Sequence, residues 1–307
     1  MASEFIDIRF ATNEDIPSVV HLLKLSLGES LMPKSEAFWR WKHKGNPFGE
    51  SPVLLAFDES RLVGVRAFMR WDWKQREKII RSVRAVDTAT HPDYQGKGIF
   101  RRLTLKLVDQ CKIDGIDFIF NTPNSSSMPG YLRMGWRKVG RMPVGFRPHL
   151  PKITGVENNP GEYGWDSCYI ASFLADTEPS EYLATKYTRE YFDWRYDENP
   201  NVTYHLLRGN SGNFFAIFRI RPFRFGLEMR ICEVVANQKL RSREFNSELS
   251  RCATDFGVNL MTFSGSSLPL KMLKLNAGPV VTINTLNTGT SVNFENWKPS
   301  LGDMELF

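Results

Sequence analysis

The run HPDYQGKGIFRRL occupies residues 91–103 and joins a segment with strand-like alternation to one with helical periodicity. Gly96 and Gly98 allow the main chain to take positive φ values and to approach an anion closely, and Lys97 adds positive charge beside them. The first N–H groups of a helix have no acceptor within the helix, and they lie at the positive end of its dipole. The sequence therefore predicts a phosphate-binding turn here. A glycine-rich connection with a basic helix start and no ligand is the alternative.

The segments on both sides of this turn predict a mixed fold. Apolar residues recur at helical spacing from Ile99 to Cys111, and a short apolar strand is expected over residues 116–122. A strand followed by an amphipathic helix is expected over residues 5–27, and alternation over residues 51–92 predicts an antiparallel meander of three strands. A helix between two strands implies a parallel crossover, so the predicted fold class is α/β, more closely described as α+β.

Composition restricts the class of protein. The chain is 42% hydrophobic and 24% charged, which is typical of a globular protein and excludes a disordered or fibrous one. The first residues do not resemble a signal peptide, and no apolar run is long enough for a membrane span, so a cytoplasmic location is expected. The four cysteines and five histidines are scattered along the chain, so we expect neither a metal site nor a disulfide framework.

The net charge of +6 is unevenly distributed. Residues 1–150 contain 24 Lys and Arg against 16 Asp and Glu, whereas residues 151–307 contain 16 against 18. The first half is therefore better suited to an anionic ligand, although a solvated basic surface explains the same excess. No aromatic-basic pattern typical of RNA-binding modules is present, so no nucleic-acid partner is expected.

An internal repeat indicates two copies of one fold. The run FWRWKHKGNP in the first half matches YFDWRYDENP in the second, so that Trp41 corresponds to Trp194 at an offset of 153 residues. Strand-like runs follow each copy in the same order, and the length of the chain suits two domains. We therefore predict tandem domains at residues 1–150 and 151–307.

Two motifs around the turn resemble those of a known family. The residues from Gln95 to Phe100 are similar to the Q/R-x-x-G-x-G/A pyrophosphate loop of the GNAT N-acetyltransferase superfamily. Gln95 and Gly98 match this pattern, and Phe100 replaces the usual small residue. The run NSSSMPGYLRMGW resembles a second GNAT segment, N-x-x-A-x-x-x-Y-x-K-x-G-F, with Asn124 and Tyr131 in register. Both motifs occur in the order of the family, so the first half is identified as GNAT-like.

The resemblance implies two tandem GNAT-like domains, each a mixed, mostly antiparallel twisted sheet flanked by helices. In the second copy the corresponding loop reads NQKLRSREFNSEL, without glycine, so the C-terminal domain is expected to be degenerate. In the first copy acetyl-CoA, the implied co-substrate, would lie between two parted strands. The main chain of Thr88, Ala89 and Thr90 would pair with its pantetheine, and Asn124 would hydrogen-bond the same arm. The pyrophosphate would contact Gln95, Gly96, Lys97, Gly98, Ile99, Phe100 and Arg101.

The resemblance also implies catalytic residues. Acyl transfer to an amine needs stabilisation of an oxyanion, here by a main-chain N–H such as that of Ala89, and a proton for the departing thiolate. Tyr131 would lie near the thioester sulfur and is the candidate acid, unless its ring only packs the motif helix. Asp87, on the same strand face as Ala89, is the first candidate base, and Glu29 is the second. A capping or solvated role is the alternative for each carboxylate.

Aromatic residues fall in the region where the superfamily usually builds its acceptor side. They are Phe38, Trp39 and Trp41, with His43 nearby. Because the second copy has the same aromatic helix, packing in the core is the favoured interpretation. The same question and the same preference apply to three residues after the second motif, which are Met142, Pro143 and Phe146.

The predicted function is enzymatic. An N-acetyltransferase would transfer the acetyl group of acetyl-CoA to a primary amine of a small molecule, an amino sugar or a peptide, by direct attack in a ternary complex. A FemABX-like aminoacyl transferase is one alternative, although those proteins generally lack an intact QGKG loop. A non-catalytic acyl-CoA sensor or interaction module is another, and the presence of Tyr131 argues against it. A monomer or a homodimer is expected.

Overall fold

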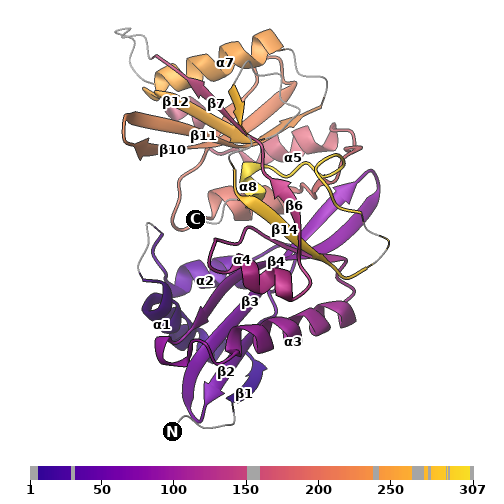
Figure 1. Ribbon diagram of the computed structural model, residues 1–307. Coiled ribbons are helices and arrows are strands. Elements are labelled where there is room, and N and C mark those ends of the chain that lie inside the picture. Colours follow the sequence, from indigo (N-terminus) through magenta and orange to yellow (C-terminus); the bar gives the residue numbers. More distant parts are fainter. Residues whose placement is uncertain are drawn as a thin grey trace.

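The computed structural model describes residues 6–28, 32–150, 160–237, 242–264, 273–275, 278–287, 289 and 291–304. Within these residues the chain forms two sheets flanked by helices, one above the other in Figure 1. This arrangement is the mixed α/β architecture, with two mostly antiparallel sheets, that the sequence predicted.

The first sheet contains the predicted meander and the crossover. Its strands are β1 (Ile6–Phe10), β2 (Val53–Asp58), β3 (Arg61–Gln75), β4 (Lys78–Thr90), β5 (Phe118–Asn121), β6 (Arg137–Arg141), β8 (Ala184–Thr185) and β14 (Val280–Thr285). The helices around it are α1 (Ile16–Leu27), α2 (Glu36–His43), α3 (Ile99–Ile113) and α4 (Met128–Arg133). The strand order is β1-β2-β3-β4-β5-β14-β6, with β8 on the far end of β3. Among these described strands, only β4 and β5 pair in parallel.

The second sheet repeats this plan. Its strands are β7 (Val144–Pro148), β9 (His205–Arg208), β10 (Phe214–Phe223), β11 (Gly226–Ala236), β12 (Leu260–Ser264) and β13 (Leu273–Leu275). The helices are α5 (Ser167–Ala175), α6 (Arg189–Phe192, continued by a π-helical turn over Asp193–Asp197), α7 (Ser242–Asp255) and α8 (Leu301–Met304). The strand order is β13-β7-β12-β11-β10-β9, with β11 and β12 in parallel. Strands β9 to β12 therefore take the places that β2 to β5 have in the first sheet.

In each sheet, a strand from the other half of the chain lies between two strands of the sheet. β14 lies between β5 and β6 in the first sheet, where Ile283 stands opposite Phe120. β7 lies between β12 and β13 in the second sheet, where Phe146 stands opposite Thr262. The exchange is visible in Figure 1, where the magenta β7 joins orange strands and the yellow-orange β14 lies beside the magenta β6. The predicted division at residue 150 stays a prediction, because both halves of the chain complete each sheet.

The repeated aromatic helices meet where the two halves join. Trp41 Nε1 donates to the carbonyl oxygen of Trp194 at 2.7 Å, and Trp194 Nε1 donates to the carbonyl oxygen of Trp41 at 2.8 Å. Their rings stack with centroids 5.2 Å apart, and Phe38 stacks on Trp41 at 5.3 Å. Reciprocal contacts of this kind are typical of a two-fold relation. With Trp39 buried as well, the core-packing interpretation of this helix is confirmed.

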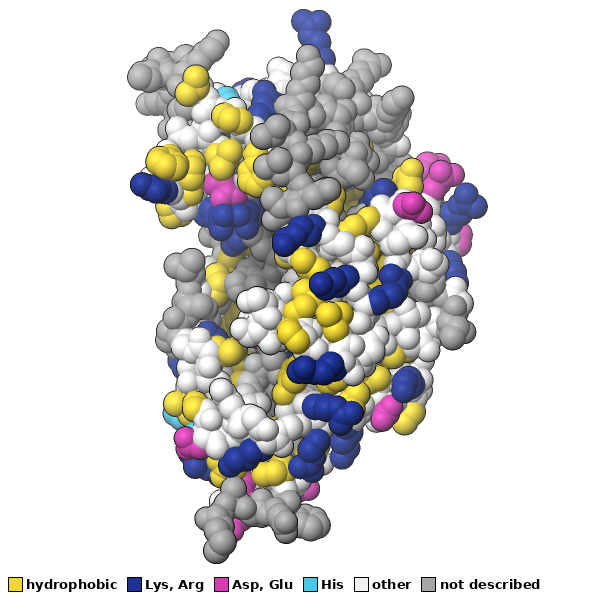
Figure 2. Space-filling model, in the orientation of Figure 1, with side chains coloured by type: hydrophobic (Ala, Val, Ile, Leu, Met, Phe, Trp, Pro, Cys, Tyr) yellow, Lys and Arg dark blue, Asp and Glu magenta, His cyan; other side chains and the backbone are white. Residues whose placement is uncertain are grey.

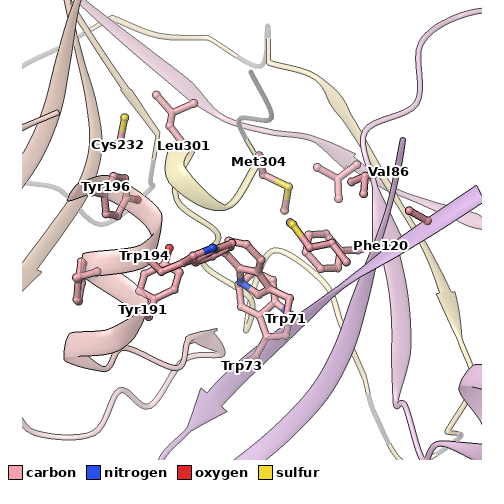
Figure 3. Close-up of a cluster of buried hydrophobic side chains, with 14 of the residues drawn as sticks. Trp71, Trp73, Val86, Phe120, Tyr191, Trp194, Tyr196, Cys232, Leu301 and Met304 are labelled. Carbon is pink, nitrogen blue, oxygen red and sulfur yellow. The ribbon is translucent and has the colours of Figure 1, made fainter. Parts of the chain in front are cut away.

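The largest hydrophobic cluster is shared by both halves (Figure 3). Trp71 and Trp73, two residues apart on β3, face the same side of the strand. Trp71 meets Tyr191 and Trp194 of the second half at centroid distances of 5.7 and 6.2 Å. Met142 is fully buried in the same cluster, as the core-packing interpretation predicted. Smaller clusters lie between the first sheet and α3 and between the second sheet and α7.

Candidate functional site

A gap opens in the first sheet where β4 and β5 part. The two strands pair only over Ser82–Arg84 and Phe118–Phe120. Beyond that point β4 has a bulge at Asp87, which has a φ of 38° and no partner in the register with β3. Because a bulge bends its strand, the end of β4 diverges from β5.

The free edge of β4 presents main-chain hydrogen-bonding groups to this gap. The N–H of His91 donates to the carbonyl oxygen of Val63 on β3 at 2.9 Å. Successive peptide groups of a strand point to opposite sides, so the N–H and C=O of Thr90 point away from β3. Gln95 Nε2 lies 3.4 Å from that Thr90 oxygen. An extended ligand can pair with this edge as another strand would.

The turn between β4 and α3 contains a run of N–H groups that meet no acceptor among the described residues. The first helical bond of α3 runs from the N–H of Arg102 to the carbonyl oxygen of Gly98 at 3.0 Å. Within the part of the chain that the structure describes, the N–H groups from Gly96 to Arg101 meet no acceptor. Gly96 and Gly98 have φ values of 78° and 77°, and a Cβ on either would meet nothing within 4 Å. These open donors fit a diphosphate.

Basic side chains surround the turn. Lys97 Nζ lies 4.3 Å from the centroid of the Tyr94 ring, and Arg102 Nη2 donates to the carbonyl oxygen of Ile6 at 3.2 Å. Arg101 is exposed and has no partner among the described residues. Figure 2 shows Lys and Arg side chains gathered over the region of α3 on this face. The positive charge predicted for the first half therefore lies beside the free N–H groups.

The second motif places Tyr131 beside the turn. Asn124 Oδ1 accepts from both the N–H and the hydroxyl of Ser127, each at 2.9 Å, which fixes the loop that leads into α4. Tyr131 is buried, and its ring lies 5.6 Å from the ring of Phe100 on α3. Its hydroxyl oxygen accepts a hydrogen bond from Arg66 Nη2 at 2.6 Å. The two motifs recognised separately in the sequence thus meet at Phe100 and Tyr131.

Asp87 lies on the other face of the sheet, against α2. Its Oδ2 accepts from Lys42 Nζ at 2.7 Å and from His43 Nε2 at 2.8 Å, and His43 Nδ1 lies 2.9 Å from Ser51 Oγ. Burial alone would raise the pKa of Asp87, but the Lys42 charge and the His43 hydrogen bond outweigh it and hold that pKa below its usual range. Burial lowers the pKa of His43 by more than Asp87 raises it, so the imidazole is neutral near pH 7.

This arrangement makes Asp87 a fixed negative charge. A neutral His43 donates from Nε2 to the carboxylate and accepts from Ser51 at Nδ1, so both of its ring nitrogens are occupied. Asp87 Oδ1 has no partner among the described residues, and the Asp87 side chain is 24% exposed. A carboxylate with a lowered pKa is a weak proton acceptor, but Oδ1 can accept a hydrogen bond from an ammonium or amine group.

The structure brings most of the residues implied by the family resemblance to this one gap. Thr88, Ala89 and Thr90 form the end of β4, residues 95–101 form the turn, and Asn124 and Tyr131 follow β5. The side chains of Ala89 and Ile99 are buried in the core, so only their main-chain groups can face a ligand. Their roles remain predictions. Glu29 lies outside the described residues.

Sequence reasoning did not select Arg66, Ser51 or Lys42 as site residues. Arg66 had a usable signal, because it interrupts the apolar run LVGVRAFM on a strand expected to be buried. A charged residue there needs a partner within the core. The partner, Tyr131, lies 65 residues later and could not be inferred from spacing.

The second half has a corresponding bulge. On β11, Cys232 has no partner in the register with β10. It therefore corresponds to Asp87, the unpaired residue on β4. The next residue, Glu233, is buried and accepts hydrogen bonds from the hydroxyl groups of Tyr187, Tyr191, Tyr196 and Ser300. Burial, together with Asp303, raises the pKa of Glu233 to about 8.

Helix α8 packs against this second bulge. A Cβ on Gly302 would overlap Tyr196 and Glu233, so the helix lies in close contact with β11. Arg195 Nη2 donates to the carbonyl oxygen of Gly302 at 2.9 Å, and Arg84 Nη2 donates to that of Met304 at 2.6 Å. The helix therefore connects the two halves and covers the side of β11 that corresponds to the Asp87 side of β4. The loop predicted to be degenerate falls partly on residues 238–241, outside the described residues.

Two further properties concern the whole of the described chain. None of its described helices is long and apolar enough to cross a membrane. No group of three or more His, Cys, Asp and Glu side chains among the described residues is arranged to hold a metal ion.

Comparison with known proteins gives a family match for the first half. The family model of the acetyltransferase (GNAT) domain matches residues 7–139. No curated protein sequence matches the chain. The chain is also similar in fold to three solved structures, each at 14% identity or less.

The first of these is a GCN5-related N-acetyltransferase from Anabaena variabilis, with 14% identity and a TM-score of 0.64 over 92% of this chain and 73% of that one. The second is a conserved protein of Enterococcus faecalis described as a probable N-acyltransferase, with 9% identity and a TM-score of 0.66 over 92% and 73%. The third is a putative acetyltransferase from Pyrococcus horikoshii, with 14% identity and a TM-score of 0.59 over 99% and 96%. These matches extend over both sheets.

Proposed function

Because residues 7–139 match the family model of the acetyltransferase (GNAT) domain, we propose that the protein is an N-acetyltransferase of this superfamily. It transfers the acetyl group of acetyl-CoA to a primary amine of a small molecule, an amino sugar or a peptide, by direct attack in a ternary complex. The observation that carries the proposal is the run of N–H groups from Gly96 to Arg101, which meet no acceptor within the described part of the chain. Such a run fits a coenzyme diphosphate, and it opens onto the gap beside Tyr131 and Asp87.

Main-chain groups would supply most of the coenzyme contacts. The N–H groups of residues 96–101 would bind the diphosphate oxygens, with Arg101 adding a free positive charge. The free edge of β4 at Thr90 would pair with the amide groups of the pantetheine arm. Asn124 uses its side-chain oxygen within its own loop, so its amide nitrogen is left to hydrogen-bond the same arm.

Residues that line the gap would then stabilise the oxyanion and supply a proton during acyl transfer. The amine attacks the thioester carbonyl carbon, a C–N bond forms, and the C–S bond breaks to release a thiolate. A main-chain N–H at the end of β4 would stabilise the negative charge that develops on the carbonyl oxygen. Tyr131 would give its phenolic proton to the thiolate sulfur, and the proton lost by the amine would pass to solvent.

Asp87 would bind the incoming amine rather than act as a strong base. Its carboxylate is ionised, its Oδ1 is unoccupied among the described residues, and Lys42 and His43 fix its position. An ammonium group attracted to this charge would lie on the face of the sheet opposite to Tyr131, and it would lose one proton to solvent before the neutral amine attacks. The attacking group and the acid would thus approach the thioester from two sides of the gap.

A panel of amines tests this function directly. The protein would be incubated with acetyl-CoA and each amine, and thiol release would be measured for the native chain and for Tyr131→Phe. We expect release with at least one amine class, and a fall in kcat of about a hundredfold in the variant, the size of a general-acid contribution. Calorimetry should give the same affinity for acetyl-CoA in both proteins, since the phenyl ring preserves the packing on Phe100.

Other results would point elsewhere. Binding of acetyl-CoA without turnover under every amine would identify a sensor instead of an enzyme. Turnover that is unchanged in Tyr131→Phe would remove the assigned acid but keep the transferase. Absence of acetyl-CoA binding would contradict the proposal as a whole.

A further inference from the structure

Arg66 is a buried cation with no counter-ion among the residues that the structure describes. It lies on β3 with no exposed surface, and its Nη2 donates to the Tyr131 hydroxyl oxygen at 2.6 Å. Its Nε and Nη1 are buried and meet no acceptor among the described residues. No carboxylate pairs with Arg66 within the described part of the chain. Burying an unpaired guanidinium disfavours folding, so this residue calls for an explanation beyond packing.

Three aromatic rings form the surroundings of the guanidinium. Its Cζ lies 4.9 Å from the ring centroid of Phe68, and 5.4 Å from those of Phe100 and Tyr131. Attraction between the cation and these rings offsets part of the lost hydration. An apolar side chain would fill the same space without any unsatisfied donor, and replacing buried charges by apolar residues often stabilises a protein. Stability alone therefore does not favour an arginine here.

The position of Arg66 in the sheet places it at the gap. Arg66 stands opposite Thr88 in the β3–β4 register, next to the bulge at Asp87. The ring of Phe100, which replaces the small residue usual in the pyrophosphate loop, covers both Arg66 and Tyr131. Phe100 of the loop and Arg66 of β3 are thus in contact with each other, and both contact Tyr131, the candidate acid.

We propose that Arg66 is a positioning residue that fixes the hydroxyl of Tyr131 as a proton donor. The inference rests on the proposed function. Because the phenolic oxygen accepts from Arg66 Nη2, its hydrogen must point elsewhere, and it meets no acceptor among the described residues. When this proton passes to the thiolate sulfur, the phenolate that is left stays 2.6 Å from a positive charge in a poorly hydrated site. Arg66 neither gains nor loses a proton, and solvent returns the proton to Tyr131.

Kinetics of four variants test the proposal, with acetyl-CoA and an amine identified in the panel. The variants are Arg66→Met, Arg66→Lys, Tyr131→Phe and the double variant Arg66→Met with Tyr131→Phe. We expect Arg66→Met to lower kcat about tenfold, the rate equivalent of one charge-assisted hydrogen bond. The KM for acetyl-CoA should stay within about twofold, because Arg66 would act on the transition state alone. Arg66→Lys should recover part of kcat, and the double variant should be no slower than Tyr131→Phe.

Two readouts separate this role from a structural one. The thermal unfolding midpoint of Arg66→Met should equal or exceed that of the native protein, since an uncompensated buried charge is removed. Phe68→Leu is the matched control, because it loosens the same aromatic surroundings and leaves the hydrogen bond in place. It should unfold at a lower temperature and keep the native kcat.

A spectroscopic measurement keeps the inference testable without turnover. In protein labelled with 13C at the tyrosine Cζ, the Tyr131 resonance, assigned from its loss in Tyr131→Phe, should shift in Arg66→Met and not in Phe68→Leu. The inference is overturned by an unshifted resonance, by losses that multiply in the double variant, or by a kcat loss that follows a fall in stability. If the resonance shifts in Arg66→Met but the native protein releases no thiol with any amine, the proposed function is contradicted. The contact between Arg66 and Tyr131 is then still supported.

Discussion

Gly98 is excluded from carrying a side chain by its backbone conformation and not by lack of space. Its φ is 77°, and a Cβ there would meet nothing within 4 Å. A non-glycine residue in this conformation costs about 1–2 kcal/mol, and its Cβ would stand beside the free N–H groups of the turn. We expect Gly98→Ala to lower the free energy of unfolding by about 1 kcal/mol and to raise the calorimetric Kd for acetyl-CoA at least about tenfold.

Gly115 provides the matched control at the other end of α3. Its φ is 69°, and a Cβ on it would also meet nothing within 4 Å. Gly115→Ala should therefore lose the same stability and keep the native Kd. Equal Kd values in the two variants would show that the turn at Gly98 does not bind the coenzyme.

At the scale of single residues, the sequence identifies groups whose chemistry is local. Gln95, Gly98 and Tyr131 belong to short motifs in which spacing along the chain sets the geometry, so a resemblance can select them. The ion pair of Lys42 with Asp87 joins residues that are far apart in the sequence, and it depends on how α2 packs against a bulged strand. No periodicity records such a contact, which is why both Lys42 and Arg66 were recognised only in the structure.

At the scale of elements, strands with partners nearby in the sequence are predicted, and strands with distant partners are not. The meander of β2, β3 and β4 and the crossover through α3 follow from periodicity and short connections, so the sequence predicts them with nearly the observed bounds. Strand β14 is not predicted from the sequence, and neither is the sheet that it joins. Its partners Phe120 and Arg141 lie well over 100 residues away, so only the folded chain determines the pairing.

The burial of Glu233 between α8 and β11 predicts how the free energy of unfolding changes with pH. Burial, with Asp303 adding to it, raises the pKa of Glu233 from 4.5 to about 8. Between those values the folded state binds more protons than the unfolded state, so the free energy of unfolding falls as pH rises and levels off above about 8. Glu233→Gln cannot titrate. From pH 5 to 8 its free energy of unfolding should therefore rise relative to that of the native protein, by about 3 kcal/mol.

Urea denaturation at several pH values measures this difference. Glu228→Gln is the control, because hydrogen bonding and two arginines hold the pKa of Glu228 below its ordinary value despite burial. Both states of the native protein are ionised at Glu228 from about pH 5 to 8, so this variant should differ from the native protein by a constant amount. A constant difference for Glu233→Gln as well would show that Glu233 is already ionised in the folded state.

At the scale of the whole molecule, the exchanged strands and the shared core make the halves interdependent. Residues 1–150 alone would lack β14 between β5 and β6, and the cluster around Trp71 would lose Tyr191 and Trp194. We expect residues 1–150 and residues 151–307, expressed separately, to show no cooperative unfolding by circular dichroism. Expressed together as two chains, they should purify as one complex with a single unfolding transition. A cooperative transition in either half alone would contradict this prediction.

The placement of β14 also sets the order of events on the ribosome. The edge of β5 is synthesised by residue 121, but the strand that pairs with it ends at residue 285. At typical elongation rates the nascent chain keeps that edge unpaired for on the order of ten seconds. During this time the hydrophobic edge around Phe120 is open to pairing with other nascent chains. Yield in vivo should therefore depend on translation speed and on chaperones that bind during synthesis, more than the stability of the finished protein suggests.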